Sequence, residues 1–230
     1  MGGKPARWPV QPRVEAVKLG LVTDIHEDIE HLQAALDRFR TAAVERIVML
    51  GDIFETGPRL DAAVAILADA GAIGVWGNHD FGLCVDPSDF ARGRFRPATL
   101  AYMATLRPRL ELDGCLFTHV EPWLDPTDIR QLWHVEDRPL TPELIARSLD
   151  AAPQRVLFLG HFHRWLAATG AGLLPWDGRS PLRLDPAERY LVIINGVVEG
   201  WCATYDTATG ELVPIDLRTG PRPAASHASG

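Results

Sequence analysis

The 230-residue sequence lacks the features that mark secreted and membrane proteins. Its three cysteines, at positions 84, 115 and 202, lie far apart and without C-x-x-C spacing, which disfavours both a disulfide framework and a thiolate zinc site. No run of 18 apolar residues is present, so no membrane span is predicted. The Pro- and Gly-rich start of the chain has no apolar signal-peptide core. We therefore expect a cytoplasmic protein.

The sequence also lacks a surplus of positive charge. Its formal net charge is −7, which argues against a broad face for binding a nucleic-acid polymer. This charge is still compatible with a small anionic substrate held by local metal charge. With 47% hydrophobic and 23% charged residues, the composition is typical of a globular protein that has one large core.

Strand and helix patterns alternate in the first part of the chain. Residues 17–23 and 46–50 have the apolar character of buried strands, and residues 28–40 between them have a helical period. This βαβ unit predicts an α/β fold with a parallel sheet. Further helices are predicted at 60–70, 97–106 and 141–149, and further strands at 73–76, 110–112, 115–118, 155–159, 190–194, 201–205 and 211–217.

The part of the chain after Trp165 contains short strands and turns, and we expect it to be antiparallel. Residues 81–96 and 120–140 are expected to be irregular. No internal repeat or linker divides the sequence, so residues 14–217 are predicted to form one domain. Residues 1–13 and 218–230 are predicted to be irregular tails.

Polar residues that can bind metals follow five of the predicted strands or loops. In open α/β sheets, ligands bind at the carboxyl ends of the strands. If the chain stays extended there, side chains at positions i and i+2 face the same side. The two residues of the D-x-H motif can then act as a pair, and so can those of the H-x-H motif. The residues concerned are Asp24, His26, Asp52, Asn78, His79, His119, His161 and His163.

Imidazole, carboxylate and amide donors without sulfur suit divalent Mn, Fe, Co, Ni or Zn. Seven ligands drawn from these eight residues would be too many for one tetrahedral ion. They suit two ions that share a bridging carboxylate, about 3.5–4 Å apart.

These residues resemble the calcineurin-like metallophosphoesterase superfamily, whose motifs run D-x-H, G-D, G-N-H-[DE], H and G-H-x-H. All five occur in order between Asp24 and His163. The resemblance implies a four-layer α/β/β/α sandwich of mixed sheets, with the metal site at the C-terminal strand ends. It also implies two ligand sets that share Asp52: Asp24, His26, Asp52 and His163 for one ion, and Asp52, Asn78, His119 and His161 for the other.

The resemblance further implies hydrolysis of a small phosphate monoester or diester, with nucleotides among the candidates. A hydroxide bridging the two metals would attack in line, and the site would keep about one positive charge to attract phosphate. Asp52 and His79 are the predicted catalytic residues, and His79 would protonate the leaving oxygen or stabilise the transition state. Asn78 and His79 are predicted to contact the substrate. Asp80 would either orient His79 or form a structural hydrogen bond.

Two motifs depart from the pattern of the superfamily's protein phosphatases and diadenosine tetraphosphatases. Those enzymes typically carry D-x-H-G and G-D-x-x-D-R-G, whereas Glu27 follows His26 here and residues 55–56 are Glu-Thr. The missing Asp-Arg pair disfavours a protein phosphatase. A non-catalytic scaffold on this fold would be expected to show decayed motifs. A purely structural metal protein would have no use for His79.

Two further groups have both a functional and a structural interpretation. Arg92, Arg94 and Arg96 could clamp a phosphate, but a solvated surface run is the favoured interpretation. Trp123, Trp133 and His134 could line a substrate cleft, but packing beneath a loop is favoured.

Overall fold

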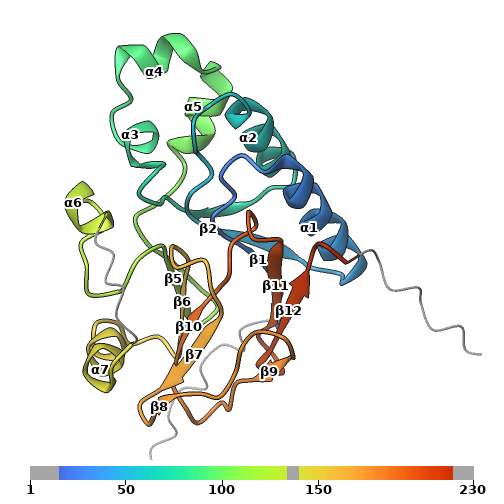
Figure 1. Cartoon of the computed structure of the whole chain (residues 1–230), viewed down its shortest axis with the longest axis vertical. Helices are drawn as coiled ribbons and strands as arrows, with labels where there is room; N and C mark the ends of the chain where they lie inside the picture. The colour runs from blue at the N-terminus through green and yellow to red at the C-terminus, as the bar shows by residue number, and fades with distance from the viewer. Residues whose placement is uncertain (1–15, 134–139, 220–230) are drawn as a thin grey trace, which may run out of the picture.

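Two mixed β-sheets form the centre of the computed structural model, which describes residues 16–133 and 140–219 (Figure 1). The strands of the first sheet are β1 (Lys18–Val22), β2 (Arg46–Leu50), β3 (Ile73–Val75), β9 (Leu182–Arg183), β11 (Trp201–Asp206) and β12 (Glu211–Asp216), in the order β3-β2-β1-β11-β12-β9. Those of the second are β4 (Leu110–Leu112), β5 (Cys115–Thr118), β6 (Val156–Leu159), β7 (Leu166–Thr169), β8 (Gly172–Leu173) and β10 (Tyr190–Ile193), in the order β4-β5-β6-β10-β7-β8.

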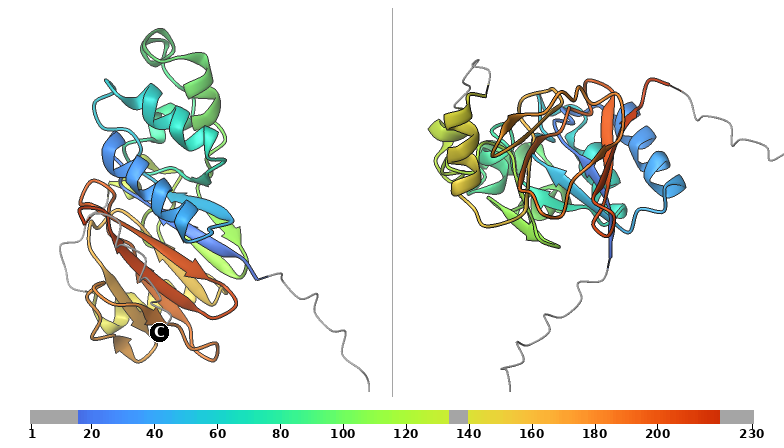
Figure 2. Two further views of the ribbon diagram at one scale, coloured as in Figure 1. Left: turned by 90° about the vertical axis from the view of Figure 1, so that its right-hand side faces the viewer. Right: turned by 90° about the horizontal axis from the view of Figure 1, so that it is seen from below.

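Helices cover the outer faces of both sheets and complete four layers (Figure 2). The first sheet is covered by α1 (Ile29–Thr41) and α2 (Leu60–Asp69), and the second by α7 (Pro142–Asp150). The side chain of Phe39 in α1 lies directly on Gly20 of β1, where an added Cβ would be 2.7 Å from the phenyl ring. The α/β/β/α sandwich expected from the sequence is therefore confirmed.

The expectation that the chain after Trp165 is antiparallel is wrong in part. The pairs β7–β8, β7–β10, β11–β12 and β9–β12 are antiparallel, but β10 runs parallel to β6. Moreover, β11 joins the first sheet beside β1. The βαβ unit leaves one edge of β1 without a partner, and buried backbone N–H and C=O groups there require one.

Three aromatic side chains pack together in the core between the sheets. Phe117 and Phe158 stack with their ring centroids 5.4 Å apart, and Tyr205 of the opposite sheet meets Phe158 edge-on at 5.2 Å. All three are at most 1% exposed. This core fixes the two sheets face to face, so that the ends of their parallel strands meet along one edge.

The segments expected to be irregular contain short helices. These are α3 (Phe81–Cys84), α4 (Asp89–Arg94) and α6 (Ile129–Leu132). The predicted helix α5 (Pro97–Met103) follows α4. The side chain of Ser88 caps α4 and that of Asp128 caps α6. Helices of four to six residues are too short to show a hydrophobic period, which explains why the sequence pattern missed them.

Two observations concern the limits of the fold. None of the described helices is long and apolar enough to cross a membrane. Residues 1–13 and most of 218–230, predicted as tails, lie outside the described residues, and the domain limits of 14 and 217 stay a prediction.

The aromatic core gives a stability prediction. We expect Phe158→Ala to lower the free energy of unfolding by about 3–5 kcal/mol, because it removes buried surface and leaves a cavity between the sheets. Phe158→Leu should cost less than Phe158→Ala, because leucine retains more of the buried apolar surface and leaves a smaller cavity. Urea unfolding followed by circular dichroism measures both. Phe90→Ala, at a side chain that is 74% exposed on α4, is the control and should stay within about 0.5 kcal/mol of wild type.

Candidate metal centre

The predicted metal ligands follow the C-terminal ends of five strands that run in parallel pairs. β1, β2 and β3 are parallel in the first sheet, as are β5 and β6 in the second. Their C-terminal ends open into a cleft of about 550 Å³. The cleft is lined by His26, Asp52, Glu55, Asn78, His79, Trp133, His161, His163, Val198 and Glu199.

The backbone at this edge is not extended, contrary to the expectation for the D-x-H and H-x-H pairs. Asp24 and His26 have φ of 48° and 45°, and His161 and His163 have φ of 71° and 46°. Asp52 also has a positive φ of 59°. Non-glycine residues seldom adopt this left-handed region, and such strain clusters at functional sites. The paired side chains converge because the chain turns sharply, not because it is extended.

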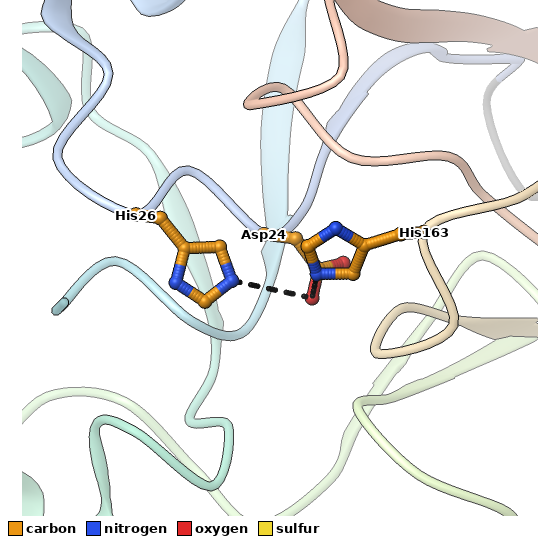
Figure 3. A group of neighbouring side chains, drawn as sticks. All are labelled: Asp24, His26 and His163. Atoms are coloured by element: carbon orange, nitrogen blue, oxygen red, sulfur yellow. Dashed lines mark ion pairs between the residues drawn. The ribbon is translucent and has the colours of Figure 1, made fainter.

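One group of potential ligands consists of Asp24, His26 and His163 (Figure 3). The Oδ1 atom of Asp24 lies 3.3 Å from Nε2 of His163 and 4.0 Å from Nε2 of His26. Its Oδ2 atom accepts hydrogen bonds from the Thr23 hydroxyl (2.7 Å) and the His161 N–H (3.0 Å). Oδ1 itself is buried and has no hydrogen-bond partner among the described residues. A bound cation would satisfy this oxygen.

A second group consists of Asp52, Asn78, His119 and His161. Nε2 of His119 lies 2.9 Å from Oδ1 of Asn78 and 3.2 Å from Oδ2 of Asp52. Nδ1 of His161 lies 3.0 Å from the same Asn78 oxygen and 3.2 Å from His119 Nε2. The donor atoms of these four side chains therefore converge on one point.

Asp52 stands between the two groups. Its Oδ2 atom is 3.2 Å from Nε2 of His119 and 3.9 Å from Nε2 of His26. Its Oδ1 atom accepts the backbone N–H of His79 at 3.0 Å. Glycines make this approach feasible: a Cβ on Gly51 (φ 102°) would strike His119, and a Cβ on Gly77 would overlap the Asp52 carboxylate.

The arrangement fits two divalent cations. With metal–donor distances of about 2.0–2.2 Å, neighbouring ligand atoms lie about 3.0–3.5 Å apart, close to most of the separations observed. The imidazoles are also held for coordination. Nδ1 of His119 donates to the Leu50 carbonyl (2.7 Å), and Nδ1 of His26 lies 2.7 Å from Glu55 Oε2, which leaves both Nε2 lone pairs facing the centre. The structure brings all seven predicted ligands together, and their division between two ions stays a prediction.

Strong charge coupling links Asp52 and His119. Burial opposes ionisation of Asp52, but the His119 charge and hydrogen bond outweigh burial and lower the Asp52 pKa to about 2. Burial likewise opposes protonation of His119, but the Asp52 carboxylate raises the His119 pKa to about 9. Burial and the neighbouring His119 charge lower the pKa of His161 to about 4. Without metal, a proton on His119 therefore balances part of the carboxylate charge.

Asp80 performs a structural task, and it does not orient His79. Its buried carboxylate accepts the backbone N–H groups of Asp52 (2.7 Å), Ile53 (3.0 Å), Phe54 (3.0 Å) and Gly77 (3.1 Å). These contacts tie the turn after β2 to the turn after β3. Of the two roles predicted for Asp80, orienting His79 or forming structural hydrogen bonds, the structure shows the second.

Two glutamates that the sequence analysis did not assign to the site also shape it. Glu55 Oε2 lies 2.7 Å from Nδ1 of His26 and 3.5 Å from Nδ1 of His79. The buried Glu27 carboxylate accepts the N–H groups of Glu55, Gly57 and Arg59 at 2.5–3.0 Å and so fixes the loop that carries Glu55. Glu55 occupies the second acidic position of the G-D-x-x-D-R-G pattern, which is the signal that could have identified it.

The arginine and aromatic candidates divide between the functional and the structural interpretation. Arg92 pairs with Asp86, Arg96 pairs with Asp61, and Arg94 donates to the Thr56 carbonyl, so none of the three lines the cleft. Trp133 does line the cleft. Trp123 instead packs against Arg147, whose guanidinium carbon lies 3.7 Å from the centroid of the Trp123 ring. His134 lies outside the described residues.

Comparison with known proteins identifies the family and the fold. The family model of the calcineurin-like phosphoesterase superfamily domain matches residues 17–175 of the sequence. The fold is similar to a metallophosphoesterase from Sphaerobacter thermophilus, with a TM-score of 0.70 and 20% identity over 87% of each chain. It is also similar to the protein TT1561 of Thermus thermophilus, with a TM-score of 0.54 and 10% identity over 88% of this chain and 100% of that one.

A shorter sequence match is found in the uncharacterized protein MJ0912 of Methanocaldococcus jannaschii. The two sequences are 32% identical over 65 residues, which is 28% of this chain and 27% of that protein. The chain thus matches about a quarter of the length of this relative.

The His119 pKa predicts how the stability of the metal-free protein depends on pH. A pKa raised from 6.5 to about 9 stabilises the fold fully below pH 6.5, and this contribution is lost as the pH rises toward 9. We therefore expect the unfolding free energy of the chelator-treated protein to fall between pH 6.5 and 8.5.

Urea unfolding at several pH values measures this dependence, with His119→Asn as the matched variant. The variant should show a flatter profile, because the group that loses its proton is absent. Saturating Mn²⁺ should remove the decline in the wild type, since the metal binds the deprotonated imidazole. A decline of equal size in the variant would contradict the assignment to His119.

Proposed function

Because the chain belongs to the calcineurin-like phosphoesterase superfamily, we propose that it is a hydrolase that uses two divalent metal ions to cleave a small phosphate monoester or diester. The observation that carries the proposal is the position of the Asp52 carboxylate. One oxygen of this side chain faces an imidazole nitrogen of each of two ligand groups. Mn, Fe, Zn, Co and Ni all suit these nitrogen and oxygen donors.

Bound in this way, the two ions would supply Lewis-acid stabilisation of the phosphate and a water of lowered pKa. Asp24, His26 and His163 would hold one ion, and Asn78, His119 and His161 the other, with Asp52 contacting both. The Asn78 amide, at the meeting point of the second group, would also contact a phosphate oxygen.

His79 is proposed as the catalytic acid. Its imidazole lies at the cleft and is 26% exposed. Its ring packs edge-on against His26, with centroids 4.8 Å apart, and its Nδ1 faces Glu55. If Nδ1 donates to Glu55, the other ring nitrogen is left for the leaving oxygen. Glu55 would then position the imidazole.

The substrate and its setting are part of the proposal. A cytoplasmic enzyme acting on a small phosphate ester, rather than on a nucleic-acid polymer or at a membrane, agrees with the net charge of −7. A protein phosphatase is less well supported, since Thr56 stands where that branch has arginine. A non-catalytic scaffold would not need every ligand position intact.

We expect Asp52→Asn to abolish activity, because an amide is a much weaker ligand and cannot serve both ions. Purified protein reconstituted with Mn²⁺ should be assayed on p-nitrophenyl phosphate, bis-p-nitrophenyl phosphate and cyclic nucleotides, with metal content measured alongside. The metal content should fall from two ions to one or none. Asp113→Asn, in the β4–β5 turn, is the matched control and should change neither quantity. Full activity in Asp52→Asn would overturn the proposal, as would an inactive wild type with every metal.

His79→Ala should lower kcat by about 10²- to 10⁴-fold while both ions stay bound. This measurement separates two roles, since a ring nitrogen of His79 also lies near a ring nitrogen of His26 and a carboxylate oxygen of Asp52, in a group able to hold a metal. Loss of one ion in the variant would identify His79 as a ligand and exclude it as the acid.

A further inference from the structure

We propose that the group released by this enzyme carries an aromatic ring without negative charge, which stacks on the indole of Trp133. The inference rests on the proposed function and adds to it the chemical class of the leaving group. It comes from the mouth of the cleft, which none of the metal-ligand motifs describes.

Trp133 is placed as a binding platform. It follows α6 directly, and it lines the cleft while remaining 52% exposed. Its ring centroid lies 5.0 Å from that of His79, with the two planes inclined at 44°. An exposed tryptophan beside a catalytic centre leaves a large apolar surface in water, and an aromatic ligand ring would cover it favourably.

The direction of the leaving group follows from His79. A substrate phosphate held by Asn78 and the ion centre would point its leaving oxygen toward the proposed acid. The group attached to that oxygen must then extend past the His79 imidazole. The next large side chain of the described cleft in that direction is Trp133, because the two rings are in contact.

The charges around the cleft disfavour a negatively charged group. None of the described residues that line the cleft is Lys or Arg. Two carboxylates, Glu55 and Glu199, lie at the cleft with 46% and 55% exposed side chains. An additional negative charge on the leaving group would meet these carboxylates without a described cationic partner, and like charges at short range repel.

The test compares esters whose leaving alcohols have similar pKa values. Benzyl phosphate, cyclohexylmethyl phosphate and 4-carboxybenzyl phosphate differ in aromaticity and charge, and each is assayed as the monoester and as the methyl diester. Wild-type kcat/KM should favour the benzyl over the cyclohexylmethyl ester by about 2- to 13-fold, the range expected for an aromatic pair. The carboxybenzyl ester should be turned over less efficiently than the benzyl ester.

Three variants locate the effect. Trp133→Leu should reduce the benzyl preference to about 1-fold, and Trp133→Phe should retain it. Phe90→Leu, at an exposed aromatic side chain outside the cleft, should leave the ratio unchanged. An unchanged ratio in Trp133→Leu, or equal turnover of the carboxybenzyl ester, would contradict the inference while the proposed hydrolase function stands. If neither these esters nor the nitrophenyl esters are hydrolysed, the proposed function itself fails, and the inference fails with it.

Discussion

The geometry of the centre depends on the buried carboxylate of Asp80. By accepting N–H groups from Asp52, Ile53, Phe54 and Gly77, it joins the turns that end β2 and β3. Those turns carry Asp52, Asn78 and His79, so one side chain sets the relative position of three site residues. The arrangement has a cost, because burial and the nearby Asp52 charge raise the pKa of Asp80 to about 6. The backbone hydrogen bonds offset this cost and keep the carboxylate useful as an acceptor.

The same region shows how a polar centre is tolerated at the edge of the two sheets. Asp24 and Asp52 are almost fully buried, and an uncompensated buried carboxylate is expensive. In the metal-free protein, His119 and His163 provide partial compensation through contacts to Asp52 and Asp24, respectively. The Oδ1 atom of Asp24 lies 3.3 Å from Nε2 of His163 but accepts no hydrogen bond among the described residues, so its charge is only partly compensated. A cation between these groups would remove the remaining imbalance.

Much of the fold and of the ligand set could be predicted from the sequence, for a physical reason. Parallel strands buried on both faces are continuous apolar runs, and a polar D-x-H or G-D that interrupts such a run marks the functional edge. The pairing of β11 with β1 could not be predicted, since it joins residues about 185 positions apart without a local signal. The left-handed turns at Asp24 and His161 were also missed, because neither residue type demands a positive φ. The structural roles of Glu27 and Asp80 depend on backbone N–H directions that only the folded loops define.

The two parts of the cleft are built on different principles. At its base, Asp52 and His119 are buried, and each is fixed by hydrogen bonds to the backbone of another segment. At its mouth, Trp133 and Glu199 are exposed and belong to segments outside the five metal-ligand motifs. Residues of the base cannot change without disturbing both sheets, whereas residues of the mouth can change at little cost to stability. The choice of substrate is therefore expected to depend on the mouth, where the sequence pattern carries the least information.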